Sequence, residues 1–179
     1  YTVYGTRIIM KLYKLRLVLI LISFVTQSCS QQPKDCSDGV FQERNGLVVF
    51  EAEDTSLSDG WSLQSEIEDY SGEGYITWVD STTTETDGQG LLSYKIRISK
   101  PEIYTLKFRN YPSCEDFRAC NDVFVKVHSG DWQKNFNHTL SNWDWNFQQD
   151  IDHVFSNSEF FLNKGEHTLS FSGRSQDFS

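Results

Sequence analysis

The sequence predicts an all-β fold, a β-sandwich or jelly roll, from three observations. Apolar residues recur at every second position in several short segments, and polar stretches rich in Gly, Asn, Asp and Ser separate these segments. No segment shows a convincing helical period. Several short strands joined by polar loops are typical of sandwiches and jelly rolls.

The first expected strands cover residues 47–53 and 74–79. Side chains alternate between the two faces of a strand, so Glu51 and Glu53 share one face. Two close carboxylates repel each other, and a hard cation that accepts oxygen ligands would offset the repulsion. The alternative is that both side chains face water on an edge strand.

The clearest alternation lies in three later segments, residues 90–99, 103–111 and 122–128. Each carries apolar side chains on one face and polar or basic ones on the other. The inward positions are Leu92, Tyr94, Ile96 and Ile98 in the first, Tyr104, Leu106 and Phe108 in the second, and Val123, Val125 and Val127 in the third.

Residues 160–163 and 166–172 complete the series of strands, with Leu169 and Phe171 inward. The turn residues 163–166 predict that these last two strands form a hairpin. Residues 129–157 are expected to be irregular, and a loop of this length in a small domain is usually functional.

The first 28 residues have the composition of a leader rather than of a fold. Basic residues precede an apolar run at 17–25, which is far shorter than the ~20 residues of a membrane-spanning helix. We interpret residues 10–28 as a secretory signal peptide. Met10 is the only methionine, so translation is expected to begin there and residues 1–9 to be upstream sequence.

Ser28-Cys29 after the apolar run resembles a bacterial lipoprotein signal, although Gln27 stands where a smaller residue is usual. Lipidation at Cys29 would anchor the protein to the outer membrane, on its periplasmic side or at the cell surface. Cleavage elsewhere would leave Cys29 an ordinary thiol. Polar residues 29–46, which contain Cys36, are expected to form a tether, and residues 47–179 the domain.

The charge excludes one class of partner. Removal of residues 1–28 removes four basic residues and leaves 12 basic residues against 25 acidic ones, a net charge near −13. Such a surface repels nucleic acid and anionic membranes, so no nucleic-acid partner is expected and membrane contact only through the lipid anchor. Aromatic residues make up 15% of the chain, many in polar surroundings, which is typical of a surface that stacks on a flat ligand.

Cys114 and Cys120 enclose five residues between two expected strands. In an exported protein this spacing indicates a disulfide. A metal site is disfavoured because no histidine lies within the loop. The histidines of the whole chain share no metal-ligand spacing, so we expect them at the surface.

Several motifs occur in an order that resembles a known family. They are Phe50-Glu51-Ala52-Glu53, Gly74-Tyr75-Ile76-Thr77-Trp78, Tyr104 to Arg109, Asn121-Asp122-Val123, Trp143-Asp144-Trp145, Gly165 to Leu169 and Gly173-Arg174-Ser175. In this order they resemble the galactose-binding-like jelly-roll carbohydrate-binding modules of families 6 and 35 and their malectin-like relatives, over residues 47–179.

The resemblance implies a non-catalytic module that binds a polysaccharide or oligosaccharide at its loops and holds a structural Ca²⁺ away from the sugar. It places calcium ligands at Glu51 and Glu53. The chain stops at Ser179 without a closing strand or polar tail after Gly173-Arg174-Ser175, so we interpret it as truncated. The resemblance implies a further aspartate ligand in a final strand beyond Ser179, so the calcium site is expected to be incomplete.

Candidate sugar contacts follow from side-chain chemistry, since aromatic rings pack on sugar C–H faces and polar groups bind hydroxyls. Trp143 and Trp145 alternate around Asp144, and one of the two indoles could instead fill the core. Trp78 is equally suited to a platform or to the core. Arg109, Asn121 and Asp122 are the polar candidates, and Arg109 could instead form an ion pair with Asp122. By contrast, Trp61 is expected to be structural.

Three functions are compatible with these residues. The first is carbohydrate binding on an exported lipoprotein. The second is an ancillary domain of a glycan-active enzyme whose catalytic domain follows Ser179, and the third is a protein-interaction or adhesin domain. Catalysis within this chain is not expected, because no carboxylate pair lies in a motif that marks an acid and a base.

Overall fold

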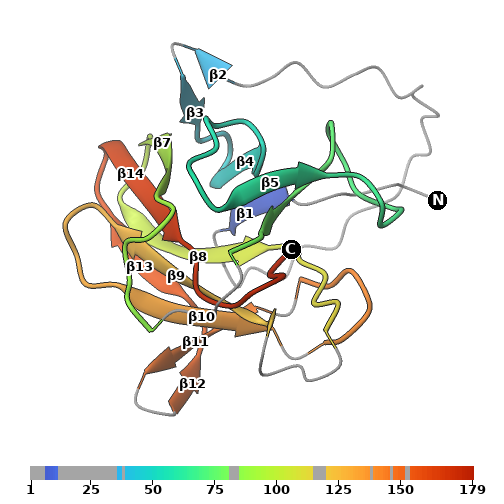
Figure 1. The fold of residues 1–179 in the computed structure, drawn as a ribbon. Coiled ribbons are helices and arrows are strands. Elements are labelled where there is room, and N and C mark those ends of the chain that lie inside the picture. The colour runs from blue at the N-terminus through green and yellow to red at the C-terminus, as the bar shows by residue number, and fades with distance from the viewer. Residues whose placement is uncertain are drawn as a thin grey trace, which may run out of the picture.

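The structure is a computed structural model, and the prediction of an all-β protein is confirmed (Figure 1). Among the described residues only Cys120 is helical, and no described helix is long and apolar enough to cross a membrane. The described residues are 7–11, 36–37, 39–80, 85–114, 120–137, 139–145, 147–151 and 154–179.

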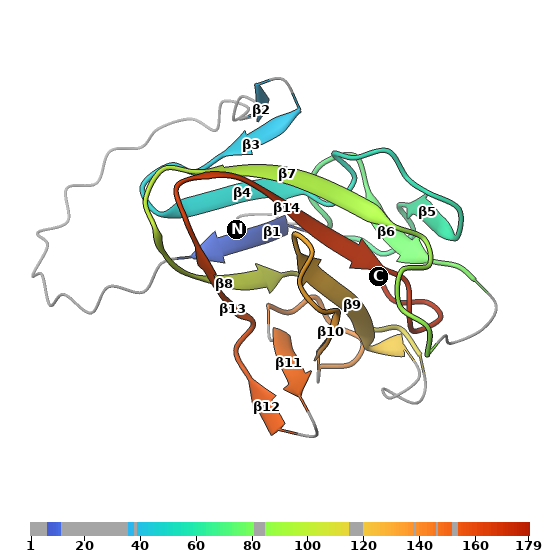
Figure 2. The ribbon, with the colours of Figure 1, turned by 90° about the vertical axis from the view of Figure 1, so that its left-hand side faces the viewer.

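The described strands form two large sheets and one small one. The four-stranded sheet has the order β13-β8-β1-β4, and all its pairs are antiparallel. Figure 2 shows β4, β1 and β8 side by side. The strands are β1 (Arg7–Lys11), β4 (Leu47–Glu51), β8 (Glu102–Phe108) and β13 (Glu159–Leu162).

The eight-stranded sheet has the order β12-β11-β10-β9-β14-β7-β3-β2, and only β3 and β7 pair in parallel among the described strands. Its β11 and β12 extend away from the rest of the body (Figures 1 and 2). The strands are β2 (Cys36–Ser37), β3 (Val40–Gln42), β7 (Leu92–Ile98), β9 (Asp122–Val127), β10 (Gln133–Asn137), β11 (Phe147–Ile151), β12 (Val154–Ser156) and β14 (Gly165–Ser172).

One core lies between the two large sheets. Phe50 of β4 packs on Phe41 of β3 and on Tyr94 of β7, with ring centroids 4.4 and 4.9 Å apart. Phe108 of β8 meets Phe171 of β14 edge to face at 5.7 Å. The expected inward residues of β7, β8 and β9 belong to this core or pack against it, so the predicted inward positions are correct. In β8 the expected outward residue Thr105 is buried as well.

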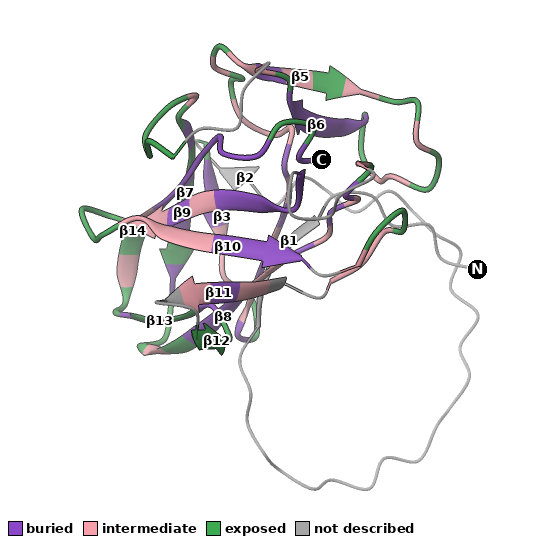
Figure 3. Cartoon of the chain, turned by 60° about the horizontal axis from the view of Figure 1, so that its bottom comes forward, coloured by how far each residue is buried: buried purple, intermediate pink, exposed green. Residues whose placement is uncertain are grey.

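A third, two-stranded sheet joins β5 (Trp61–Gln64) to β6 (Tyr75–Trp78). All four residues of β6 are buried, as its colour in Figure 3 shows. The backbone of Trp78 is further bonded to the C-terminal segment, through Phe178 O at 2.9 Å and Asp177 N at 2.9 Å. The β5–β6 sheet therefore closes one end of the core, with Trp61 buried there as expected.

The expected domain boundary at residue 47 is too late. Val40 and Phe41 are both 5% exposed, and β3 pairs with β7. Residues 40–46 therefore belong to the fold, because Phe41 supplies an aromatic ring to the core. Of the expected tether, residues 29–35 and 38 lie outside the described residues.

The expected irregular segment 129–157 contains three strands, β10 to β12. Alternation was not visible because amides occupy inward positions: Asn135 and Asn137 are fully buried and Gln149 is 3% exposed. Asn137 donates to Asn110 Oδ1 at 2.7 Å, and Ser158 donates to Asn135. Buried amides of this kind are tolerated because they are hydrogen-bonded.

The predicted hairpin at residues 163–166 is wrong. The turn is present, but β13 pairs with β8 in one sheet and β14 pairs with β7 and β9 in the other. The chain crosses from sheet to sheet at Gly165, whose φ of +137° favours glycine.

Met10 and Lys11 fall both in the expected signal peptide and in β1, which pairs with β4 and β8. The rest of that peptide, and Cys29 with it, lies outside the described residues. The signal peptide and the lipidation of Cys29 therefore stay predictions.

Candidate functional site

Trp143 lies at the centre of a group of aromatic side chains. Its ring meets Tyr75 and Tyr111 edge to face, with centroids 5.5 and 5.4 Å apart, and Tyr70 lies 6.2 Å from Tyr75. We call these four residues the aromatic cluster. Tyr75 is buried, whereas the other three are partly exposed, so the cluster is rooted in the core and opens to solvent.

The guanidinium of Arg109 lies over the Trp143 ring, 5.0 Å from its centroid. It also donates a hydrogen bond of 2.7 Å to the carbonyl of Asp69. Burial lowers the pKa of Arg109, and the neighbouring Asp69 charge partly opposes this effect. The cation stays charged at any physiological pH, and its contact with an indole face is favourable.

Backbone pairing fixes the position of the Trp143 indole. Asn110, two residues beyond the end of β8, forms an isolated antiparallel bridge to Asp144, with two hydrogen bonds of 3.2 Å. The indole Nε1–H of Trp143 then donates to the carbonyl of Glu68 at 2.8 Å. The ring is thus fixed both by its own backbone and by the loop between β5 and β6.

That loop, residues 65–74, also covers the two carboxylates predicted to bind metal. Ser71 donates to Glu51 Oε2 at 2.7 Å, and the backbone N–H of Glu73 donates to Glu53 Oε1 at 2.9 Å. A Cβ added to Gly72 would contact the side chains of both glutamates. One loop contacts both the carboxylates and Trp143, so a change in the conformation of this loop would affect both candidate sites.

Glu53 fits a cation better than a proton at neutral pH. Its Oε2 is buried and has no hydrogen-bond partner among the described residues. Burial raises the pKa of Glu53 to about 6. A cation beside this oxygen would supply the partner that the fold does not.

Two glutamates alone do not complete a calcium site. Ca²⁺ takes six to eight oxygen ligands, and the described part of the chain holds no group of three or more His, Cys, Asp and Glu side chains that could hold a metal. Backbone carbonyls, water or other residues would have to supply the remaining oxygens.

Trp78 is a core residue, which corrects its inclusion among the sugar contacts. It is 2% exposed, and its indole meets Trp61 at 5.3 Å. A Cβ on Gly60, Gly90 or Gly173 would overlap the ring, so these glycines leave the space that the indole fills. A side chain this enclosed can fill the core but cannot serve as a platform for a sugar.

Asn121 and Asp122 are also internal. Asn121 is 6% exposed and donates to the carbonyl of Asn137 at 2.9 Å. Asp122 is 5% exposed and accepts from Arg174 and Ser175. The alternative of an ion pair between Arg109 and Asp122 is therefore wrong, because Arg174 pairs with Asp122 instead. Neither residue reaches the surface on which Trp143 lies.

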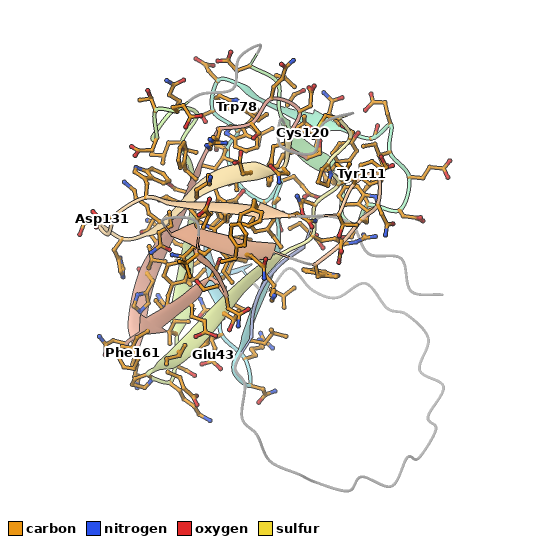
Figure 4. All side chains as sticks on the ribbon, turned by 90° about the horizontal axis from the view of Figure 1, so that it is seen from below. Glu43, Trp78, Tyr111, Cys120, Asp131 and Phe161 are labelled. Atoms are coloured by element: carbon orange, nitrogen blue, oxygen red, sulfur yellow. A yellow bond between two sulfur atoms is a disulfide. The ribbon has the colours of Figure 1, made fainter. Side chains whose placement is uncertain are left out.

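The disulfide between Cys114 and Cys120 is confirmed. It follows the end of β8 and precedes β9, so it ties the segment after Tyr111 to the eight-stranded sheet. Residues 115–119 inside the loop lie outside the described residues. Figure 4 shows Cys120 and Tyr111 near each other in that view.

Trp145 is partly exposed and makes no ring contact or hydrogen bond with another described residue. It differs in this from Trp143, two residues earlier. Of the two tryptophans, Trp143 therefore belongs to the aromatic cluster and Trp145 does not.

The core contains a cavity of about 30 Å³, lined by residues that include Phe108, Asn110 and Phe178. A space of this size is too small for a sugar ring. This cavity is therefore not the sugar site.

No protein-family model matches the chain, and no curated protein matches it. The assignment of function consequently depends on the geometry of the aromatic cluster and of the Glu51–Glu53 pair, together with the sequence resemblance.

The sequence does not indicate that Tyr70, Tyr75 and Tyr111 belong to the site. Tyr75 lies in an expected strand, and Tyr111 is the last residue of another expected strand. Their contact with Trp143 depends on the 65–74 loop and on the Asn110–Asp144 bridge, which join distant parts of the chain. In the sequence, the one feature that indicates a ligand-binding role for these tyrosines is their polar surroundings.

Proposed function

We propose that this domain binds carbohydrate without catalysis, at the aromatic cluster and Arg109. The observation that carries the proposal is the Trp143 indole, which is partly exposed and yet oriented by contacts with the Glu68 carbonyl, with Arg109 and with two tyrosine rings. A pre-positioned indole loses little entropy when a sugar ring packs on it.

Arg109 supplies the polar part of this site. A guanidinium carries five N–H donors, and the Asp69 bond uses one. The remaining donors suit sugar hydroxyls or a sugar carboxylate. Trp145, two residues from Trp143 and also partly exposed, is the second indole assigned to the site.

The finer fold assignment is part of the same proposal. Two packed sheets, a Glu-Ala-Glu segment at the end of β4 and a Trp-Asp-Trp segment near the end of β8 support a galactose-binding-like jelly roll of the family 6, 35 or malectin-like type. Under this assignment Glu51 and Glu53 hold a structural Ca²⁺, supported by the buried, unpartnered Oε2 of Glu53.

Ca²⁺ would act on the sugar site only through the 65–74 loop. It would order Ser71 and Glu73 against the glutamates, and the same loop presents the Glu68 and Asp69 carbonyls to Trp143 and Arg109. Export as a lipoprotein anchored through Cys29 would place this binding surface in the periplasm or at the cell surface, where it can contact polysaccharide.

Affinity electrophoresis through gels containing soluble polysaccharides, preceded by a glycan array, tests the proposal. The full chain should be retarded by at least one polysaccharide, and Trp143→Ala should abolish the retardation. Trp132→Ala is the matched control, because Trp132 is also a partly exposed indole under a cation, Lys126, but follows β9. Retardation that survives Trp143→Ala, or is lost in Trp132→Ala, would place the site elsewhere.

A further inference from the structure

Two histidines that lie 39 residues apart in the sequence meet at the end of the eight-stranded sheet. The Nε2 of His128 lies 2.6 Å from the Nδ1 of His167, and the ring centroids are 4.6 Å apart. His128 directly follows β9, and His167 belongs to β14, which pairs with β9. Strand pairing therefore brings together two imidazoles whose sequence spacing matches no metal motif.

The fold fixes the tautomer of His167. Its Nε2 lies 2.7 Å from the carbonyl oxygen of Asn163, which can only accept, so Nε2 carries the proton. The Nδ1 of His167 is consequently a lone-pair donor aimed at His128. A backbone carbonyl on the far nitrogen is the arrangement that orients histidine ligands in metal sites.

His128 is held toward His167 at a backbone cost. Its φ is +54°, in the left-handed region that non-glycine residues rarely adopt. Its N–H donates to the carbonyl of Thr168 at 2.8 Å, which fixes this conformation. The residue is exposed whereas His167 is 8% exposed, so the pair joins one anchored ring to one that solvent can reach.

We propose that His128 and His167 form a binding site for a divalent first-row transition metal ion, with water completing the coordination. Neutral imidazole is a good ligand for Zn²⁺, Ni²⁺ and Cu²⁺, and Cu²⁺ binds such a site most tightly. This site is separate from the proposed sugar site. Asn121, directly before β9, is linked through Asn137 to Asn110, whereas His128 follows the other end of β9. Figure 4 shows Asp131, three residues after His128, on the opposite side of that view from Tyr111.

Binding requires a small movement. Metal–nitrogen bonds of about 2.0–2.1 Å in tetrahedral geometry place two ligand nitrogens about 3.3 Å apart, so the rings must separate by about 0.7 Å. The ion replaces the N–H···N hydrogen bond, and the proton on His128 moves from Nε2 to Nδ1 of the same ring. The bond from His167 to Asn163 is unchanged, and the exposed His128 makes the adjustment.

Isothermal titration of the untagged full chain with Zn²⁺ tests this site. One ion should bind, and His128→Asn should weaken it at least about tenfold, since even loss of a partner of a ligating histidine costs that much. Asparagine tolerates a positive φ, so the turn is kept. The matched control replaces His138 and His153 together with Asn and should leave the affinity unchanged.

A measurement on the unaltered protein covers the case in which a variant misfolds. Sub-stoichiometric Cu²⁺ should broaden the imidazole ring signals of His128 and His167 in NMR spectra before those of the other two histidines. Absence of Zn²⁺ binding, an unchanged affinity in His128→Asn, or first broadening at His138 or His153 would overturn the proposal.

Discussion

The core around Trp78 and the aromatic cluster around Trp143 each contain an indole in contact with another aromatic ring, but the two indoles have opposite surroundings. Trp78 is enclosed by glycine backbone at Gly60, Gly90 and Gly173, and its Nε1 has no hydrogen-bond partner among the described residues. Trp143 is partly exposed and its Nε1 is bonded to a loop carbonyl. The first ring serves packing, whereas the second is oriented.

The comparison shows that the neighbours of a tryptophan, more than its position on a strand, indicate its role. Glycines that leave space for an indole mark a structural ring. A polar contact to the indole N–H together with a stacked guanidinium marks a ring whose orientation matters. Replacement of a structural ring such as Trp78 should lower the free energy of unfolding, whereas replacement of an oriented ring such as Trp143 should weaken ligand binding.

Trp78→Ala should produce the largest effect on stability. Removal of a fully buried indole costs about 3–5 kcal/mol of unfolding free energy, through lost burial and the cavity left behind. Urea denaturation followed by circular dichroism measures it. Trp143→Ala, at the partly exposed ring, should cost less than half as much, and equal losses would remove the distinction between the two rings.

Gly173→Ala should come next, at about 1–3 kcal/mol, because the added Cβ would overlap the Trp78 indole. The double variant with Trp78→Leu checks the cause, since a smaller side chain makes room for the methyl group. The cost of Gly173→Ala should shrink in that background. An unchanged cost would show that the glycine acts through its own backbone.

Replacement of Glu53 should change how stability depends on pH. The folded pKa, raised by burial to about 6, exceeds the ordinary value of 4.5, so the folded protein holds this proton more tightly than the unfolded chain. The resulting stabilisation is full below about pH 4.5 and is lost as the pH rises through 6. In EDTA, Glu53→Gln should therefore be more stable than the original protein at pH 7, by about 1 kcal/mol after solvent screening.

Calcium should reverse this difference, because it binds the ionised carboxylate. Ca²⁺ should raise the melting temperature of the original protein above pH 6 and not that of Glu53→Gln. Glu73→Gln is the control, since that exposed residue of the 65–74 loop contacts Glu53 through its backbone N–H. Equal calcium shifts in the original protein and Glu53→Gln would contradict the metal assignment.

The sequence predicted the strands whose inward positions are apolar. In β7, β8, β9 and β14 the expected inward residues lie in the core or pack against it, and burial alternates strictly in β7. It did not predict β10 and β11, because Asn135, Asn137 and Gln149 occupy inward positions there and their burial depends on partners such as Asn110 and Ser158. A pattern of apolar residues cannot reveal a core position filled by a bonded amide.

The site was only partly predictable, because the role of a polar side chain also depends on the partners that the fold brings to it. Trp143 and Arg109 were identified from their chemistry, and the structure brings them into contact. The side chains of Asn121 and Asp122 are equally suited to bind sugar hydroxyls. Inside the fold, however, Asn121 is hydrogen-bonded to Asn137 and Asp122 is paired with Arg174. The pairing of His128 with His167 depends on the register of β9 and β14, which local sequence does not encode.

The five indole N–H signals in a ¹H–¹⁵N spectrum can be followed individually as an oligosaccharide is added, after assignment with single Trp→Phe variants. The sugar should shift the signals of Trp143 and Trp145 with one common dissociation constant, while those of Trp61, Trp78 and Trp132 stay in place. A bound sugar that shifts Trp132 and leaves Trp143 unchanged would contradict a carbohydrate site at the aromatic cluster.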